Sequence, residues 1–306
     1  MSTRPVSIAC PRLVLGIVAS LFLAQVANAQ LKPPDTSIRT EQVAPGVYML
    51  MGNGGNLGVS VGDDGVFLID DQYAPSTPAI DAAIRKLKDV SPRFVLNTHW
   101  HGDHTGGNEN LGKAGAVIVA QDNVRTRMSV PQFTSFFDRK TPASAPGALP
   151  VVTFSETVTF WFNGDEIHAF HVAPAHTDGD VIVHFRKANV FHMGDTFFRS
   201  YPFIDVDSGG SVVGMIGAAD RVLAMAGPAT KIIPGHGPLA TPAELKEFRD
   251  MLADVSGRVR SLMRDGKSMD EIVAAKPTAA YDAKWKSGFI DGERLTRMLV
   301  NDLKRP

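Results

Sequence analysis

The sequence predicts an α/β fold in which two β-sheets pack together and helices cover their outer faces. Short apolar runs, typical of strands, come first and are followed by a run with helical period; the same order then repeats. Gly-rich turns separate many of the strand runs, whereas a single parallel doubly wound sheet would alternate strands and helices regularly. The 277 residues that follow position 29 suit one large domain of this class.

The first 29 residues have the pattern of a secretory signal peptide. Arg4 and Arg12 give a positive start, and residues 13–26 form an apolar run that is too short to span a bilayer. The small-x-small tripeptide at 27–29 predicts cleavage after Ala29 and export to the periplasm or the medium, with an uncleaved anchor as the alternative. Because Cys10 lies inside this segment, the mature chain has no thiol, and every metal ligand must be His, Asp or Glu.

The charge balance argues against nucleic acid as a partner. Residues 1–29 hold two arginines and no acid, so the mature chain has 29 basic and 32 acidic residues. A nucleic-acid-binding protein would need a basic face. Nothing after the signal peptide is long and apolar enough for a transmembrane helix. We therefore expect a small-molecule substrate, no nucleic acid, and no stable membrane insertion after signal cleavage.

The predicted elements of the first half run from a polar N-terminal arm into the proposed domain. Residues 30–43 are polar and contain proline, which predicts a loose arm, and the domain proper is expected at 44–240. Residues 121–150 combine four prolines with three phenylalanines and predict an irregular aromatic segment of functional interest. Strands are expected at 47–51, 57–62, 65–70, 93–98 and 115–120, with a helix at 76–90.

The second half repeats the pattern and ends in helices. Strands are expected at 157–162, 165–172, 180–185, 189–194 and from 230, with a helix at 211–226. Residues 241–306 predict C-terminal helices packed on the domain. Thr241 and Glu244 have the spacing of a capping box, and Pro242 occupies the first helical position.

The stretch "NTHWHGDHTGGN" from Asn97 to Asn108 carries the chemistry. It follows a buried strand and places four metal-affine side chains, His99, His101, Asp103 and His104, within six residues. Gly102 permits a turn between the two pairs. Four ligands this close are too crowded for one closed tetrahedral site. The spacing therefore predicts the start of two neighbouring metal sites.

Three further candidates lie at other strand ends. His176, Asp195 and His236 each adjoin a strand run, and Gly or Pro flanks each of them. A single His near a loop is more often a surface residue than a ligand, so His176 and His236 are weaker candidates than the cluster. The remaining histidines lie within strand runs and are expected to pack or to face solvent: His168, His171, His184 and His192.

The motif "THWHGDH", followed in order by His176, Asp195 and His236, resembles the metallo-β-lactamase superfamily from about Tyr48 to Leu239. That resemblance implies an αββα four-layer sandwich with two Zn²⁺ per chain at one edge. It assigns one zinc to His99, His101 and His176, and the second to Asp103, His104 and His236, with Asp195 bridging or completing the second site. It also implies that Asp70 orients a metal-binding His, although a turn-capping pair with Asp71 is the alternative.

The chemistry implied is hydrolysis by a metal-bound hydroxide that Asp103 orients as catalytic residue. Iron or manganese suits the same mixed ligands. Substrate selection is expected from three loops, 52–56, 121–150 and 197–210, with Asn53 and Arg199 as candidate substrate-binding residues. An ordinary surface charge is the alternative for Arg199.

Four functions fit these residues. The first is an exported zinc hydrolase of an amide, lactam or ester, possibly with β-lactamase activity, although an aspartate stands at 195 where many secreted enzymes of that kind carry cysteine. The second is a thioesterase similar to glyoxalase II. The third is a lactonase, a group with tyrosine where this chain has Phe198. The fourth, from another class, is a non-catalytic metal-binding module.

Overall fold

The computed structural model describes residues 1–2, 37–286 and 288–305. The expected signal peptide and its cleavage site at Ala29 lie outside the described residues. Contacts divide the chain into two units, Met1–Pro34 and Asp35–Pro306, and the second unit holds the fold. Among the described helices, none is both long and apolar enough to cross a bilayer.

The first sheet of the described residues is mixed. Its order is β1-β2-β3-β4-β5-β6-β9, antiparallel from β1 to β4 and parallel from β4 to β9. Parallel pairing brings the carboxyl ends of β4, β5 and β6 to one edge of the sheet. The strands are β1 Arg39–Ala44, β2 Val47–Met51, β3 Leu57–Gly62, β4 Gly65–Ile69, β5 Phe94–Leu96, β6 Val117–Gln121 and β9 Val152–Phe154.

The second sheet of the described residues has the order β10-β11-β12-β13-β14. Its strands pair antiparallel except for β13 and β14, which run parallel. The residues that follow β13 and β14 therefore leave the sheet at the same edge. The strands are β10 Thr157–Phe162, β11 Asp165–His171, β12 Val181–Phe185, β13 Val190–His192 and β14 Lys231–Ile233.

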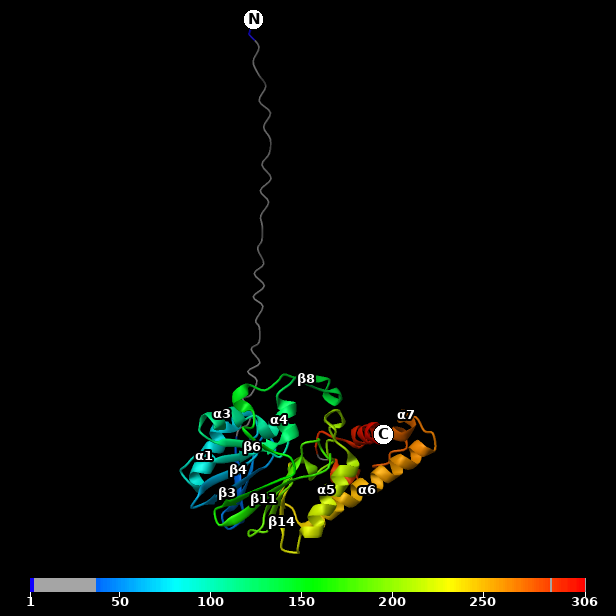
Figure 1. The fold of residues 1–306 in the computed structure, drawn as a ribbon. Helices are drawn as coiled ribbons and strands as arrows, with labels where there is room; N and C mark the ends of the chain where they lie inside the picture. Colours follow the sequence, from blue (N-terminus) through cyan, green and yellow to red (C-terminus); the bar gives the residue numbers. More distant parts are fainter. Residues whose placement is uncertain (3–36, 287, 306) are drawn as a thin grey trace. The chain divides into compact units, whose positions relative to one another are not determined.

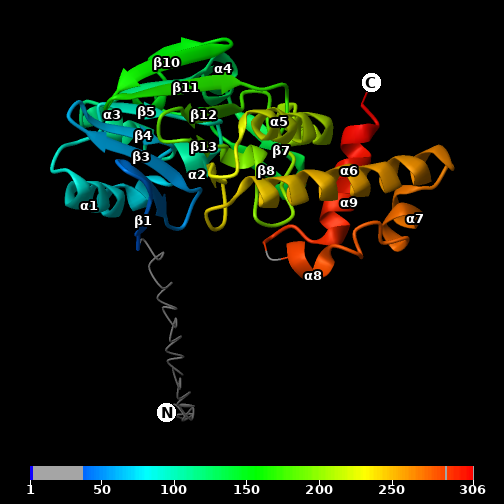
Figure 2. The ribbon, with the colours of Figure 1, turned by 90° about the horizontal axis from the view of Figure 1, so that it is seen from below.

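The two sheets lie face to face, with helices on both outer sides, as Figures 1 and 2 show. Alternation along the strands builds three apolar layers. Met49, Phe67 and Ile69 pack between the sheets against Ala169 and Val183. The other two layers lie between each sheet and its helices. The first sheet packs against α1 Thr77–Leu87 and α3 Asn108–Lys113, and the second against α5 Val212–Met225 and α6 Pro242–Arg264. The expected αββα sandwich is therefore confirmed.

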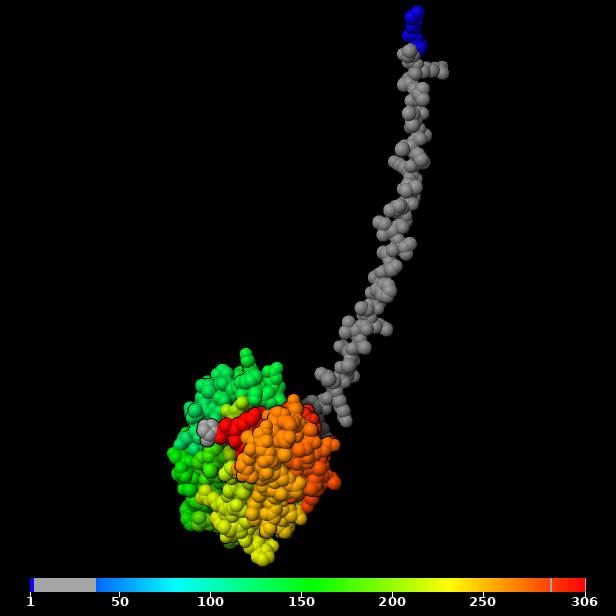
Figure 3. All heavy atoms as spheres, turned by 90° about the vertical axis from the view of Figure 1, so that its right-hand side faces the viewer, coloured from blue at the N-terminus to red at the C-terminus, as the bar shows by residue number. Residues whose placement is uncertain are grey.

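The C-terminal helices share the core of the second sheet. In Figure 3 these residues, drawn in orange and red, cover the centre and right of the face, beside segments drawn in green and yellow. Phe248 of α6 lies 5.1 Å from the ring of Phe197 and 5.8 Å from Trp285. The capping box of α6 is present as predicted, with Thr241 and Glu244 bonded reciprocally. The remaining C-terminal helices are α7 Met269–Ala274, α8 Asp282–Trp285 and α9 Gly292–Leu303.

Two expectations differ from the structure. Part of the expected loose arm is strand β1, which pairs with β2 along its length. None of its residues is buried, because an edge strand is fixed by backbone hydrogen bonds rather than by an apolar pattern. The segment expected to be irregular is partly regular: it contains helix α4 Asp122–Met128 and a hairpin of β7 Gln132–Thr134 and β8 Arg139–Thr141.

Candidate metal centre

Seven donor side chains meet where strands of both sheets end. His99 and His101 follow β5, and Asp103 and His104 lie in the short helix α2 Gly102–Thr105. The other three come from the second sheet: His176 precedes β12, Asp195 lies in a turn after β13, and His236 follows β14. The side chains form two groups, in each of which one donor atom per residue lies within 4.8 Å of the others: His99, His101, His176 and Asp195; and Asp103, His104 and His236.

The first group has its nitrogen atoms turned toward one point. His101 Nδ1 lies 2.8 Å from His176 Nε2, and Asp195 Oδ2 lies 3.5 Å from the same His176 nitrogen. His99 Nε2 is 3.8 Å from Asp195 Oδ2, and it is buried without a hydrogen-bond partner among the described residues. A buried imidazole nitrogen is seldom left without a partner. Together the three histidines and the carboxylate form a donor set suited to a metal ion.

The second group is built similarly from two histidines and a carboxylate. His104 Nε2 lies 3.4 Å from His236 Nε2. Asp103 Oδ2 lies 3.3 Å from the His236 nitrogen and 3.7 Å from that of His104. Two nitrogens and one carboxylate oxygen leave room for the coordination of a water or a substrate.

Asp195 faces both groups with different oxygens. Its Oδ2 points to the histidines of the first group, whereas its Oδ1 lies 3.1 Å from His104 Nε2 and 3.5 Å from His236 Nε2. The carboxylate is positioned in the tight turn η4 Gly194–Thr196. A Cβ added at Gly235 would lie 2.0 Å from Asp195 Oδ1, so the approach of the two turns requires glycine there. If each group held an ion, Asp195 would offer one carboxylate oxygen to each of them.

The electrostatics of the two groups differ. Burial lowers the pKa of His176 to about 4, and burial together with His104 holds the pKa of His99 well below its ordinary value. Burial also opposes the charge of His236, yet Asp195 and Asp103 raise its pKa to about 9. His99 and His176 of the first group therefore present neutral nitrogen donors at neutral pH, whereas His236 of the second group holds a proton that a metal would displace.

Charges within the second group complete this picture. Burial disfavours the charged form of His104, but Asp195, Asp70 and Asp103 raise its pKa well above the ordinary value. Burial alone would raise the pKa of Asp195, but His104, His236 and His176 hold it well below its usual range. The same two histidines, His104 and His236, also hold the pKa of Asp103 below its usual range despite burial. Both carboxylates are therefore ionised, as metal binding requires.

Asp70 orients one histidine of each group. Its Oδ2 accepts hydrogen bonds from His104 Nδ1 and from Thr98 Oγ1, each at 2.7 Å. Thr98 Oγ1 in turn lies 3.1 Å from His99 Nδ1; because its own hydrogen goes to Asp70, it accepts the hydrogen bond from His99. This fixes both imidazoles with Nε2 directed inward, which is the role that outer carboxylates have in metal sites. The neighbouring Asp71 faces elsewhere and accepts from the backbone N–H of Gly107.

Sequence reasoning missed Asp205, which orients His101. Its buried Oδ2 accepts a hydrogen bond of 2.8 Å from His101 Nε2, and this leaves Nδ1 for the metal point. The carbonyl of Phe203 holds His176 in the same way, through Nδ1 at 2.8 Å. No spacing signal identifies Asp205, because it lies in the loop after β13 and is distant in sequence from the histidine that it holds.

The side chains of the two candidate substrate-binding residues do not face the cavity over the donors, although the backbone N–H of Arg199 donates to the carbonyl of His236 at 3.1 Å. Arg199 forms an ion pair of 2.6 Å with Glu244 at the start of α6. Asn53 is exposed and lines a shallow hollow with Ser37, Arg39 and Met51. Neither is among the described residues that line the cavity over the donors. The four histidines expected to pack or to face solvent also lie outside both donor groups.

A cavity of about 250 Å³ opens above the two groups. Two of the three loops expected to select substrate contribute to it, through Thr134, Phe137 and Arg139 and through Phe198 and Phe203. Loop 52–56 is not among its described lining. Tyr73 and Phe289 also line it, and the sequence did not indicate either. The cavity is thus largely aromatic around a polar floor of Asp103, Asp195 and the histidines.

Comparisons with known proteins agree with this geometry. The family model described as "Metallo-beta-lactamase superfamily" matches residues 52–236. A hydroxyacylglutathione hydrolase of Erythrobacter litoralis is 30% identical over 141 residues, which cover 43% of this chain and 47% of the relative. The chain therefore spans about half the length of this curated relative.

Solved structures share the fold at low sequence identity. The metallo-beta-lactamase DIM-1 has a TM-score of 0.58 and 20% identity, covering 72% of this chain and 98% of that one. A double mutant of the sec-alkyl sulfatase PisA1 has a TM-score of 0.67 and 19% identity, covering 87% of this chain and 50% of that one. At these identities the likeness shows the fold and nothing finer.

Proposed function

Since this chain belongs to the metallo-β-lactamase superfamily and is a metal hydrolase of that fold with a histidine-rich site, we propose that it holds two zinc ions and cleaves a carbonyl compound. The substrates proposed are amides, lactams, esters or thioesters. We further propose that the mature enzyme works in the periplasm or the medium on small molecules, as the signal-like segment before Gln30 suggests.

One observation carries the proposal: the two oxygens of Asp195 face two adjacent donor groups. The seven donors would hold two divalent ions, which when bound would lower the pKa of a water and polarise the carbonyl. Neither a serine nor a cysteine is among the described residues lining the cavity, and the one hydroxyl of an aliphatic side chain there, that of Thr134, has no histidine hydrogen-bonded to it to act as its base. A purely structural metal site would not need an open, aromatic cavity above it.

Asp103 is the proposed proton acceptor. Its Oδ2 borders the cavity, 3.3 Å from His236 Nε2, and the low pKa of Asp103 keeps the carboxylate ionised. From that position the oxygen orients the attacking water and receives its proton. Phe198, which stacks on the ring of His236 at 5.5 Å, excludes bulk water from one side.

Two substrate groups lead the list. β-Lactams are proposed for two reasons: the sequence begins with a signal-like segment, and the aromatic walls of the cavity can cover a ring system. Thioesters are the second candidate, because the bridging position is a carboxylate and a relative of 30% identity is named a hydroxyacylglutathione hydrolase. A lactonase finds less support, since Phe198 offers no phenol beside the bridging carboxylate.

A hydrolysis panel tests the proposal. Mature protein loaded with zinc is assayed on a β-lactam, a thioester, a lactone and a phosphodiester. We expect at least one carbonyl substrate to be cleaved, with loss of activity on chelation and recovery on adding zinc. Asp103→Asn should reduce turnover by a factor of roughly 100 or more, the scale of general-base catalysis. Turnover that survives chelation, or a phosphodiester as the one substrate cleaved, would refute the proposal.

A further inference from the structure

We propose that Arg139 is the anion-binding residue of the cavity and that the substrate is an amphipathic monoanion. In this reading, an apolar group lies on the aromatic wall and a carboxylate, separate from the carbonyl under attack, pairs with the guanidinium. The inference rests on the proposed hydrolase function and specifies its substrate class.

Arg139 lines the same cavity as Asp103 and Asp195 and stands at the start of β8, where its backbone pairs with Thr134. The residue is exposed. Its guanidinium makes no ion pair and no side-chain hydrogen bond with any residue in the described part of the chain, and its close contact is the ring of Phe137, 5.8 Å from the guanidinium carbon. It is therefore available to a ligand.

Other arginines near the site already have carboxylate partners. Arg199 is paired with Glu244 at 2.6 Å. Arg127 holds Asp178 through two bonds of 2.6 and 2.7 Å. Among the described residues that line the cavity, Arg139 is the one permanent cation. An anionic group entering the cavity thus finds a single unpaired guanidinium.

The hairpin that carries Arg139 is fixed to the body of the protein. Asp207 Oδ2 accepts hydrogen bonds from both the backbone N–H and the hydroxyl of Ser135, each at 2.6 Å. Phe136 packs on Phe203 with ring centroids 5.2 Å apart. These contacts lie between the two strands of the hairpin, so the backbone that carries Arg139 is already in place at the cavity before a ligand binds.

The aromatic wall supplies the apolar half of the site. Phe137 lies 5.1 Å from Phe203 and 5.8 Å from Phe289, so three rings from three segments of the chain line one side of the cavity. An apolar substituent can cover these rings while the carboxylate reaches Arg139. A planar guanidinium binds a carboxylate through two parallel hydrogen bonds, which fixes orientation as well as affinity.

Arg139 is separate from the metal-donor residues, and this keeps the substrate carboxylate from taking the place of the substrate carbonyl. A carboxylate is itself a metal ligand, and a substrate anion drawn to the donor groups would compete with the carbonyl for that position. Arg139 offers the anion a different partner at the rim. The carbonyl of the same molecule is then left to face Asp103 and Asp195.

The first test compares matched substrates. The thioester of phenylacetic acid with mercaptoacetate carries a carboxylate, and its methyl ester does not; thiol release reports both. The same comparison is made with a cephalosporin and its methyl ester. We expect the zinc-loaded wild type to prefer the acid. Arg139→Gln should lower kcat/KM for the acid roughly 10- to 100-fold, mostly through KM, because a charged hydrogen bond is lost, and should leave the ester within about threefold.

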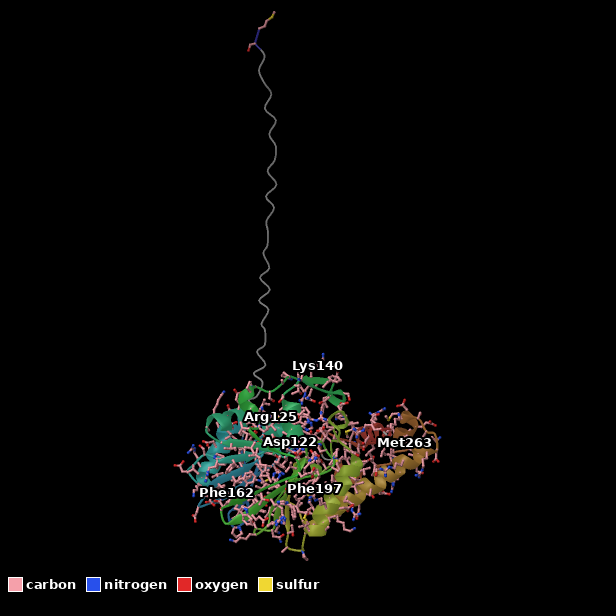
Figure 4. The ribbon with its side chains drawn as sticks, in the orientation of Figure 1. Asp122, Arg125, Lys140, Phe162, Phe197 and Met263 are labelled. Atoms are coloured by element: carbon pink, nitrogen blue, oxygen red, sulfur yellow. The ribbon has the colours of Figure 1, made fainter. Side chains whose placement is uncertain are left out.

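Lys140→Gln is the matched control. The two residues are adjacent on β8 and lose the same charge, but alternate residues of a strand face opposite sides. Lys140 is not among the residues lining the cavity and lies at the outer edge of the hairpin in Figure 4. This variant should retain the preference for the acid, and Arg139→Lys should retain part of it.

A binding test separates this inference from the proposed function. The probes are 2-mercapto-3-phenylpropanoate, which carries a free carboxylate, and its primary amide, which does not. The thiol of each binds zinc-loaded protein whether or not any substrate is turned over. Arg139→Gln should raise the Kd of the carboxylate about tenfold and leave that of the amide unchanged. Equal effects of Arg139→Gln and Lys140→Gln on the carboxylate would overturn the role of Arg139. Absence of hydrolysis with the Kd difference intact would refute the hydrolase and keep the anion site.

Discussion

The buried Oδ2 of Asp205 lies 2.8 Å from Nε2 of His101 and accepts a hydrogen bond from it, which leaves the other ring nitrogen for the metal point. Asp70 has the corresponding position behind His104, at 2.7 Å from Nδ1. The two carboxylates thus fix histidines of different donor groups. Because Asp70 also reaches His99 through Thr98, its influence extends to both groups, whereas that of Asp205 is confined to the first.

This difference predicts separable effects on metal affinity. Asp205→Asn should weaken binding at the first site, and Asp70→Asn should weaken both, each by roughly 10- to 100-fold, the usual effect of losing an outer-sphere partner. Competition with a chelator of known affinity measures the two constants. Asp207→Asn is the control, because that carboxylate holds Ser135 rather than a donor. Equal losses at both sites in Asp205→Asn would contradict the assignment.

Gly235→Ala should disturb the bridging carboxylate. The added Cβ would stand 2.0 Å from Asp195 Oδ1, so one of the two turns must shift. We expect zinc content to fall below two equivalents and turnover to drop at least tenfold, as ligand displacement by about an ångström implies. Gly217→Ala in α5 meets no atom within 4 Å and should leave both quantities unchanged, while adding about 0.5–1 kcal/mol of stability.

Metal binding should release protons from the second group. In metal-free protein the pKa of His236 is raised to about 9 and that of His104 lies well above its ordinary value. At pH 7 both imidazoles therefore carry protons that zinc must displace, and zinc affinity should rise with pH until about 9 is passed. Calorimetry in buffers of different ionisation enthalpy should report a net release of protons on zinc binding, part of it from His236.

The first group should behave differently in the same experiment. The pKa of His176 is lowered to about 4, so its nitrogen is already free above pH 5. His236→Ala should therefore reduce the number of protons released, whereas His176→Ala should not. A release that is independent of His236 would show that another group carries the proton.

Phe248→Ala tests how far the C-terminal helices stabilise the rest. The ring is fully buried and contacts Phe197, two residues after Asp195, as well as Trp285. Its removal should cost about 3–5 kcal/mol in the free energy of unfolding, as measured by denaturant titration. Trp161→Ala, at a ring that is 77% exposed, should change stability by no more than about 0.5 kcal/mol.

The sequence predicted most of the strands and the placing of donors at their ends, because apolar period and Gly/Pro turns are local signals. Strand β1 escaped prediction, since an edge strand is held by backbone pairing and carries polar side chains. The partners of the donors escaped for another reason. Asp205 and Arg139 lie in segments that the sequence marked as of interest, 197–210 and 121–150, but the contacts that single out these two residues form only in three dimensions.

Arg199 shows that closeness in sequence to a metal donor does not establish contact with the substrate. It lies four residues after Asp195, close enough to suggest contact with substrate, yet its guanidinium turns away to Glu244. That glutamate is also the capping residue of α6. Local spacing cannot reveal that a side chain is engaged by a helix that begins more than forty residues later.

The donor groups join the two sheets at one edge: His99 follows β5 of the first sheet, and His236 follows β14 of the second. The chain has a single cysteine, at position 10, so no disulfide can tie these sheets together. Bound ions would then act as reversible cross-links between them. Because ligands that bind the native state stabilise it in proportion to the logarithm of their free concentration, the unfolding temperature of the protein should follow the free zinc of its surroundings.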